Sequence, residues 1–401
     1  MMQERKHTVK KPLDLRDPEH PVNDSRDVVT GFLPTVFPYG TDFEKNRRFM
    51  LEKTVDLCFG RTPPEPEVMK VRRVSGSSYR IEAGSRERTV TWELQLTRPF
   101  GGDARRPVLL TGDRAAGYCN EAVKRMFLSA GFLIAEFDRN MLAEDSSEPD
   151  MRTRGLYPVY PDYDFGMLSA WAWGYRRSVD ALLTMGDVDP DCICITGHSR
   201  GGKATLLAGA LDERIAFTQA SGSGMFGCGC LRYTQVEAPE REIQDHHSEV
   251  LGNMFGREVG YSIAHWVGAG MEAYIGREDE IPFDFHFLKA AIAPRGLLET
   301  GSVDDVWANP RGSYQTFRAA REAYAALGVP GRIASSYRYG PHFHAPEDFR
   351  RFLDFITACR EGKPFLDDNA DRVFGTLPKI YDWSVPEGEE TEAKAAPFGS
   401  H

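Results

Sequence analysis

Residues 195–203, Ile-Thr-Gly-His-Ser-Arg-Gly-Gly-Lys, constrain the fold of this 401-residue chain more than any other stretch. An apolar run at 192–196 precedes the motif, as is typical of a buried strand, and a run of small residues at 203–210 follows it, as is typical of a helix start. A Gly-x-Ser-x-Gly turn between a strand and a helix is the context of a nucleophile elbow. Its glycines remove Cβ atoms that would clash where the backbone reverses. We predict that Ser199 is a catalytic nucleophile, the alternative being a purely structural turn.

The rest of the chain alternates between strand-like and helix-like segments. Three period-2 segments come first, at 68–73, 77–83 and 88–97. The later strands are predicted at 107–111, 132–137, 192–196, 214–219, 297–300 and 333–337, and the main helices at 45–57, 122–130, 167–185, 313–327 and 346–360. Such alternation implies a mostly parallel sheet that is covered on both faces. With the elbow, it predicts an α/β-hydrolase fold, a three-layer sandwich with a mostly parallel central sheet and a lid or insertion region.

Composition and the alternation of predicted strands and helices divide the chain into four regions. Residues 1–45 are rich in Pro, Asp and Arg and are expected to form an irregular arm on the surface. Residues 46–384 are expected to form the catalytic domain. Within it, residues 221–290 interrupt the alternation and are predicted to be an insertion that lines the pocket. The acidic tail at 385–401 is predicted to be disordered.

Composition excludes several classes of partner and cofactor. The formal net charge is −10 and the pI is about 5.6, which disfavours nucleic acid and anionic membrane surfaces. No run is long enough to span a membrane and no signal peptide is visible, so a cytoplasmic location is expected unless a leader was removed. The seven cysteines lack ligand spacing, and we expect neither a metal nor another cofactor. The oligomeric state stays open.

A nucleophilic serine needs a general base and an acid that orients this base. In this fold the two follow the serine in the order acid, then histidine. His342 lies after the last predicted strand, where a Gly-Pro turn can aim it at the elbow, and it is preferred to His344. For the acid, Asp304 is the first choice and Asp305 the second, since both follow the strand at 297–300; one of them can instead cap the turn.

Arg200 directly follows the nucleophile candidate, where a backbone N–H can stabilise a developing oxyanion. A cation at this position is costly to bury unless something negative meets it. Two interpretations fit: Arg200 faces an oxyanion or a carboxyl-bearing substrate, or it pairs with a neighbouring carboxylate.

Taken with their neighbours, these residues resemble the glucuronoyl esterases, a carbohydrate esterase family of α/β hydrolases. The resemblance extends from about Arg47 to Phe355. It rests on seven segments in the family's order: 59–63 (Phe-Gly-Arg-Thr-Pro), 170–174 (Ala-Trp-Ala-Trp-Gly), 197–203 (Gly-His-Ser-Arg-Gly-Gly-Lys), 265–266 (His-Trp), 281–286 (Ile-Pro-Phe-Asp-Phe-His), 292–295 (Ile-Ala-Pro-Arg) and 305–312 (Asp-Val-Trp-Ala-Asn-Pro-Arg-Gly).

The resemblance implies hydrolysis of esters of glucuronic acid, often 4-O-methylated and carried on xylan. It also implies roles for individual residues. Ser199 would be the nucleophile and His342 the base. Arg200 would be an oxyanion donor through its side chain, and Lys203 and Trp266 would contact the sugar. The sequence pattern alone, without the resemblance, favours a solvated lysine of the first helical turn for Lys203 and a packed aromatic residue for Trp266.

The chain departs from the family pattern in two places. Some members carry the acid in a Glu-Ser-Gly string after the strand that follows the elbow helix, but residues 220–222 here are Ala-Ser-Gly. Other, mainly bacterial, members use the later position, which supports Asp304 or Asp305. The insertion at 237–260 follows the family only loosely.

The expected partner is a small-molecule or oligosaccharide ester substrate, derived from glucuronoxylan if the resemblance holds. Two other functions remain alternatives: an acetyl(xylan) esterase that uses the same elbow chemistry, and a non-catalytic relative that binds sugar in the same pocket.

Overall fold

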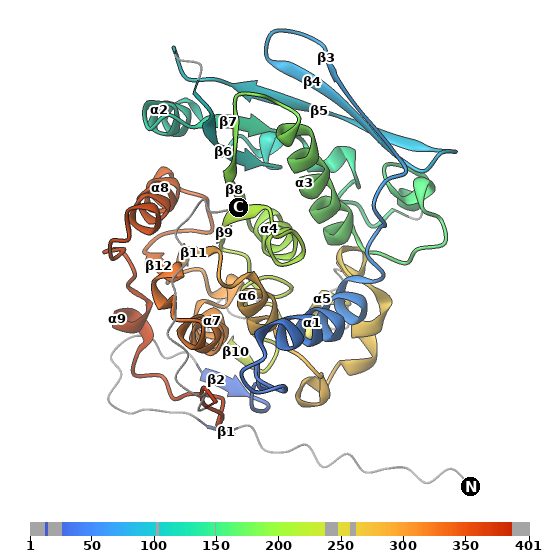
Figure 1. Cartoon of the computed structure of the whole chain (residues 1–401). Helices are drawn as coiled ribbons and strands as arrows, with labels where there is room; N and C mark the ends of the chain where they lie inside the picture. The colour runs from blue at the N-terminus through green and yellow to red at the C-terminus, as the bar shows by residue number, and fades with distance from the viewer. Residues whose placement is uncertain are drawn as a thin grey trace, which may run out of the picture.

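A nine-stranded sheet runs through the centre of the molecule, and helices cover both of its faces (Figure 1). The computed structural model describes residues 13–14, 26–101, 104–148, 150–236, 248–256 and 262–386. In spatial order the strands are β12 (Ile333–Arg338), β11 (Gly296–Ser302), β9 (Ile215–Ser221), β8 (Val188–His198), β6 (Arg106–Thr111), β7 (Leu133–Glu136), β5 (Thr89–Thr97), β4 (Ser78–Gly84) and β3 (Val68–Arg73).

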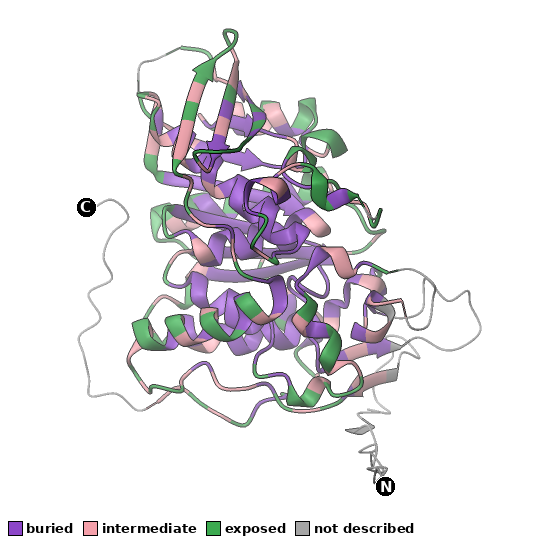
Figure 2. Ribbon diagram, turned by 90° about the vertical axis from the view of Figure 1, so that its right-hand side faces the viewer, coloured by how far each residue is buried: buried purple, intermediate pink, exposed green. Residues whose placement is uncertain are grey.

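The strands from β12 to β7 all pair in parallel, whereas β5, β4 and β3 extend the sheet as antiparallel strands. The division follows from burial, because the parallel strands are largely apolar, are buried on both faces and lie under helices. Strands β3 to β5 alternate apolar and charged residues, and their outer face is open to solvent (Figure 2). The predicted α/β-hydrolase fold is confirmed.

Helices form two layers over the sheet. One layer contains α2 (Glu121–Ser129) and α8 (Pro346–Glu361), whose phenylalanines share a core with the strands beneath them. The other layer contains the remaining long helices and a larger core (Figure 1). Its helices are α3 (Met167–Leu183), α4 (Arg200–Leu211), α6 (His286–Ile292) and α7 (Pro310–Ala326), with α1 (Phe43–Thr54) packed against α6.

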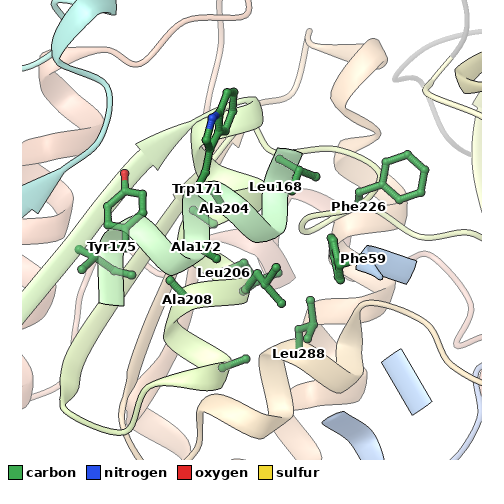
Figure 3. Close-up of a cluster of buried hydrophobic side chains, with 14 of the residues drawn as sticks. Phe59, Leu168, Trp171, Ala172, Tyr175, Ala204, Leu206, Ala208, Phe226 and Leu288 are labelled. Atoms are coloured by element: carbon green, nitrogen blue, oxygen red, sulfur yellow. The ribbon is translucent and has the colours of Figure 1, made fainter. Parts of the chain in front are cut away.

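Helix α4 lies at the centre of the larger core. Its small residues allow close packing, and its inner positions, Gly201 to Ala210, are buried on every side between the sheet, α3 and α6 (Figure 3). The Tyr175 hydroxyl of α3 ties the nearby strand ends together: it accepts a hydrogen bond from Gly112 N at 2.7 Å and donates one to Thr196 O at 3.1 Å. The helix that follows the elbow is therefore held rigidly against the ends of β6 and β8.

The N-terminal region differs from the irregular arm expected at 1–45. Strand β2 (Arg26–Val29) pairs with β10 (Tyr233–Val236) and with β1 (Leu13–Asp14), which makes a separate small sheet. Its partner strand β10 comes from the predicted insertion, about 200 residues away, so nothing local in the sequence indicates the pairing. The insertion also contributes α5 (Leu251–Met254) and the short helical turn η7 (Ala264–Trp266). A last short helix, α9 (Ala370–Phe374), follows α8.

Several predicted features fall wholly or partly outside the described residues. They are residues 387–401 of the acidic tail, residues 237–247 and 257–261 of the insertion, and most of the first 25 residues. Among the helices that are described, none combines the length and apolar character needed to cross a membrane.

Candidate active site

The elbow forms as a sharp turn at Ser199. Strand β8 ends at His198, α4 begins at Arg200, and Ser199 between them has φ 53° and ψ −120°, a conformation that side-chain-bearing residues rarely adopt. A Cβ on Gly197 would lie 2.5 Å from the carbonyl carbon of Gly201, so the two ends of the turn touch. Backbone hydrogen bonds fix the strained residue: Ser199 N donates to Ser221 O at 2.8 Å. The N-terminus of α4 points at the same place and favours a developing negative charge there.

An unpredicted carboxylate supports the elbow from β6. Asp113, which follows this strand, accepts a hydrogen bond from His198 N at 2.8 Å and forms a buried ion pair with Arg139. The guanidinium of Arg139 in turn lies 4.3 Å from the ring centroid of Trp171 in α3. Asp113 therefore fixes the backbone of His198, the residue before the nucleophile, while Ser221 of β9 fixes the backbone of Ser199.

The predicted base lies beside the elbow and contacts an acid. His342 Nδ1 lies 2.5 Å from Asp305 Oδ2, and the two rings of His342 and His198 have centroids 4.5 Å apart. Because Nδ1 faces the carboxylate, this nitrogen carries the proton and Nε2 is left to accept one. Asp305 is almost fully buried, with 4% of its side chain exposed, whereas His342 keeps 35% exposed. This is the arrangement of a base that is oriented by an inner acid and faces the substrate side.

It is Asp305, the second choice for the acid, and not Asp304, the first choice, that contacts His342. Asp304 Oδ2 accepts a hydrogen bond from Gly340 N at 2.7 Å and so fixes the loop that leads to His342. The turn after β11 directs the two adjacent side chains apart. Which aspartate caps the following turn was left open, and it is Asp305, whose Oδ1 accepts a hydrogen bond from Ala308 N at 3.3 Å while its Oδ2 faces His342.

The second histidine candidate, His344, is a packing residue. Its ring stacks on Phe349 with centroids 3.9 Å apart and is 1% exposed. Burial, and to a smaller extent the charge of Arg338, lowers the pKa of His344 to about 3. His198 lies between His344 and His342, and desolvation lowers its pKa as well. Both inner rings therefore remain neutral beside the base, so neither competes with it for the proton.

Arg200 is paired with a neighbouring carboxylate, which was one of the two interpretations left open. Its guanidinium forms an ion pair with Asp145, and 41% of the side chain stays exposed. Asp145 Oδ1 also accepts hydrogen bonds from Trp266 Nε1 at 3.0 Å and from His265 at 3.1 Å. Although burial acts to raise the pKa of Asp145, these hydrogen bonds and the charge of Arg200 lower it. One ionised carboxylate thus joins Arg200 to the tryptophan of the insertion.

Lys203 is buried and is not a solvated lysine. Its Nζ lies 2.6 Å from Ser223 O, 2.5 Å from Met225 O and 2.9 Å from Glu249 Oε2, beneath the ring of Trp266. Desolvation lowers the pKa of Lys203 and raises that of Glu249, and their mutual contact acts against both shifts. With Glu249 Oε1 at 3.1 Å as the fourth acceptor atom, the ammonium of Lys203 is fully paired inside the protein.

Three carboxylates of the site were missed by sequence reasoning: Asp113, Asp145 and Glu249. They lie 85, 55 and 46 residues from the elbow residues that they contact, in loops with no motif of their own. The only available signal was the need of Arg200 and Lys203 for compensating negative charge. Among the described residues, no group of three His, Cys, Asp or Glu side chains is placed to hold a metal ion.

The parallel sheet, the strained serine at the elbow and the histidine–aspartate pair beside it define a serine hydrolase of the α/β-hydrolase class. The model of the family described as "Glucuronyl esterase, fungi" matches residues 81–328, well over half of the chain. The chain belongs to this family of carboxylic-ester hydrolases.

Individual relatives agree with the family match. A 4-O-methyl-glucuronoyl methylesterase of Schizophyllum commune is 29% identical over 295 residues, which cover 72% of this chain and 70% of that protein. Another from Podospora anserina is 30% identical over 276 residues, covering 67% of this chain and 53% of that protein. The structure of a carbohydrate esterase family 15 glucuronoyl esterase from Caldicellulosiruptor kristjansonii has a TM-score of 0.74 and 28% identity, covering 88% of this chain and 97% of that one. The chain thus spans from about half to seven tenths of the length of these two curated relatives.

One expectation from the sequence is wrong. A cytoplasmic location was expected, but the fungal glucuronoyl esterases to which the chain is related are secreted, extracellular enzymes.

Proposed function

We propose that this protein hydrolyses esters of glucuronic acid or its 4-O-methyl ether through an acyl-enzyme on Ser199. One observation carries the proposal: His342 bonds to the buried Asp305 next to the strained elbow serine, in a chain that matches the glucuronoyl esterase family across its catalytic segments. The relatives named 4-O-methyl-glucuronoyl methylesterase supply the substrate class.

The reaction has two halves. In the first, Ser199 Oγ attacks the ester carbonyl carbon while His342 Nε2 takes the hydroxyl proton. The C–O bond to the alcohol then breaks, and the alcohol leaves with that proton. In the second half, water gives a proton to His342 and attacks the acyl carbon, so that the free uronic acid leaves and Ser199 recovers its proton. Asp305 keeps the imidazole in one tautomer and stabilises the imidazolium that forms twice in each cycle.

Negative charge develops on the carbonyl oxygen in both halves. The backbone N–H of Arg200 at the start of α4 and its half-exposed guanidinium are the donors that we assign to this oxygen. Asp145 positions the guanidinium and at the same time holds the indole of Trp266. We infer that Trp266 forms the wall of the sugar site and that the buried Lys203–Glu249 pair supports this wall from inside the protein, so that Lys203 does not contact the sugar itself.

Hydrolysis of benzyl glucuronate tests the proposal, with the wild type compared with Ser199→Ala and with Ser129→Ala, a control at an exposed serine that ends α2. The wild type and Ser129→Ala should release benzyl alcohol, and Ser199→Ala should be inactive. Turnover retained in Ser199→Ala would exclude this mechanism.

A parallel assay on acetylated xylo-oligosaccharides separates the two ester classes. We expect acetyl esters to be poor substrates, because the half-exposed guanidinium of Arg200 and the indole of Trp266 provide partners for a uronate ring that an acetyl group cannot use. Faster hydrolysis of acetyl than of uronate esters would replace the proposed substrate by the acetyl(xylan) alternative.

A further inference from the structure

A groove of about 770 Å³ lies on the outer face of strands β3, β4 and β5. Its other wall is formed by Arg114, Asp138 and Met141, which follow the carboxyl ends of β6 and β7. Strand β5 runs antiparallel to β7, so its first residues lie at this same rim. The elbow follows the carboxyl end of β8, so Ser199 and this wall of the groove lie at the same edge of the sheet.

The strand order places the groove at a definite distance from the nucleophile. From β8 the sheet continues through β6, β7, β5 and β4 to β3. At about 4.8 Å for each step, the outer strands lie roughly 19–24 Å from the elbow. This distance is too long for the monomeric ester of the proposed reaction, but it is within reach of an oligosaccharide that is bound at Ser199 by one of its acidic units.

Cations on the groove are arranged in a way that costs stability in the free protein. Arg72 of β3 is directly opposite Arg80 of β4, and like charges in directly opposed positions destabilise a sheet. Arg80 has Glu93 at 3.6 Å as a partner, and the next row pairs Lys70 with Glu82 at 3.0 Å. Arg72 forms no ion pair with any carboxylate in the described part of the chain. Neither does Arg114 across the groove. Two unpaired guanidiniums facing one hollow, in a protein with a net charge of −10, indicate an anionic ligand.

We propose that this groove is a second binding site for an acidic oligosaccharide or polysaccharide, and that it holds a carboxylate of the same chain whose esterified uronate occupies Ser199. The proposal rests on the proposed function for the identity of the ligand. Arg72 and Arg114, on opposite walls of the groove, provide the positive charge that attracts the carboxylate. Glu82, Glu93 and Thr91 accept sugar hydroxyls, and the exposed side chains of Val74 and Met141 face the C–H surfaces of the rings.

The groove suits a sparsely charged sugar chain better than a nucleic acid. Its five cationic side chains are interleaved with three carboxylates, which would repel a phosphate at every step of a polynucleotide. Its one tryptophan, Trp92, is 1% exposed and offers no face on which a base could stack. A sugar ring, in contrast, carries several hydroxyls, and these can bind both the cationic donors and the carboxylate acceptors of the groove.

The test measures binding in the inert Ser199→Ala protein by titration calorimetry. The probes are glucuronate-bearing xylo-oligosaccharides without ester groups, neutral xylo-oligosaccharides of equal length, and free glucuronic acid. The variant is Arg72→Gln/Arg114→Gln. Its control is Arg48→Gln, an exposed arginine of α1 at the other end of the molecule (Figure 1). The same two arginine substitutions are also made in the active enzyme and assayed on benzyl glucuronate.

We expect the double variant to bind the acidic oligosaccharide about fivefold more weakly or worse, with the difference shrinking as NaCl is added. Binding of free glucuronic acid and turnover of benzyl glucuronate should stay unchanged. The melting temperature of Arg72→Gln should be equal to or above that of the wild type, because an opposed like-charge pair is removed.

Unchanged affinity of the double variant for the acidic oligosaccharide would overturn the site, as would an equal loss for free glucuronic acid, which is too short to reach the groove. Binding of an RNA oligonucleotide as tight as that of the acidic oligosaccharide would assign the groove to polyphosphates instead. If benzyl glucuronate is not hydrolysed while the arginine-dependent binding persists, the proposed function fails and the groove stands.

Discussion

The two adjacent aspartates after β11 show what a single residue position decides. Both Asp304 and Asp305 follow the strand after which the fold requires an acid, and the sequence does not indicate which of the two contacts the histidine. The choice depends on the direction in which each side chain leaves the turn, and this is set by contacts with the loop at Gly340 to His342. The class of residue and its region were predictable, but the atom that contacts His342 was not.

Replacement of Asp305 tests this assignment. Asp305→Asn keeps the shape of the side chain but cannot hold the imidazolium or fix its tautomer, so kcat on benzyl glucuronate should fall by roughly 10³- to 10⁴-fold. Asp304→Asn is the matched control and should lower kcat only a few-fold, because it weakens one hydrogen bond to Gly340. Equal effects of the two substitutions would contradict the assignment.

Asp145 is the second residue whose role can be measured. It holds both Arg200 and Trp266, so Asp145→Asn should lower kcat about tenfold and raise KM by a similar factor, since oxyanion stabilisation and the sugar wall are disturbed together. Asp150→Asn removes an exposed carboxylate from the same loop, whose one ion pair within the described ranges is with Arg154, and should leave both constants unchanged. An effect on KM alone would show that Arg200 stabilises the oxyanion without being positioned by Asp145.

At the scale of elements, the local sequence pattern predicted the strands and helices, but it could not predict which distant segments pair. The main strands and helices lie within a few residues of their predicted positions, because their periodicity reflects burial on one or both faces. The pairing of β2 with β10 and the contact of Glu249 with Lys203 had no such signal, since each joins segments that are separated along the chain. The prediction therefore contained the sheet and the serine but lacked the carboxylates that hold the site together.

The elbow between β8 and α4 depends on glycine at its first position. In Gly197→Ala the new methyl group would meet the backbone of Gly201, so we expect about 1–3 kcal/mol of destabilisation and a loss of activity, as the turn must open. Gly186→Ala is the control, because a Cβ at that position meets nothing within 4 Å. Urea denaturation of both variants gives the comparison, and equal midpoints would show that the elbow tolerates widening.

For the whole molecule, buried histidines link stability to pH. Desolvation lowers the pKa of both His286 and His344 to about 3, and it lowers that of His198 as well. In the unfolded chain each would titrate near 6.5. Below this pH the unfolded state binds protons that the folded state does not, so the contribution of these histidines to the free energy of unfolding is constant above about pH 6.5 and declines as the pH falls toward 3. Each group contributes up to about 1.4 kcal/mol per pH unit within that window.

His344→Phe isolates one of these contributions. Neither ring nitrogen of His344 has a hydrogen-bond partner among the described residues, and its ring stacks on Phe349, so phenylalanine keeps the packing and loses no bond. At pH 7.5 the melting temperature should match that of the wild type, and at pH 5 it should be higher by roughly 2–4 °C, since one proton-linked penalty of about 1–2 kcal/mol is gone. Phe352→Leu, in the same core, should lower the melting temperature equally at both pH values. Parallel pH curves for the wild type and His344→Phe would mean that His344 is already accessible to protons in the folded protein. The ring of His344, which lies next to His198 on the inner side of His342, would then be one of the groups that can take up a proton during turnover.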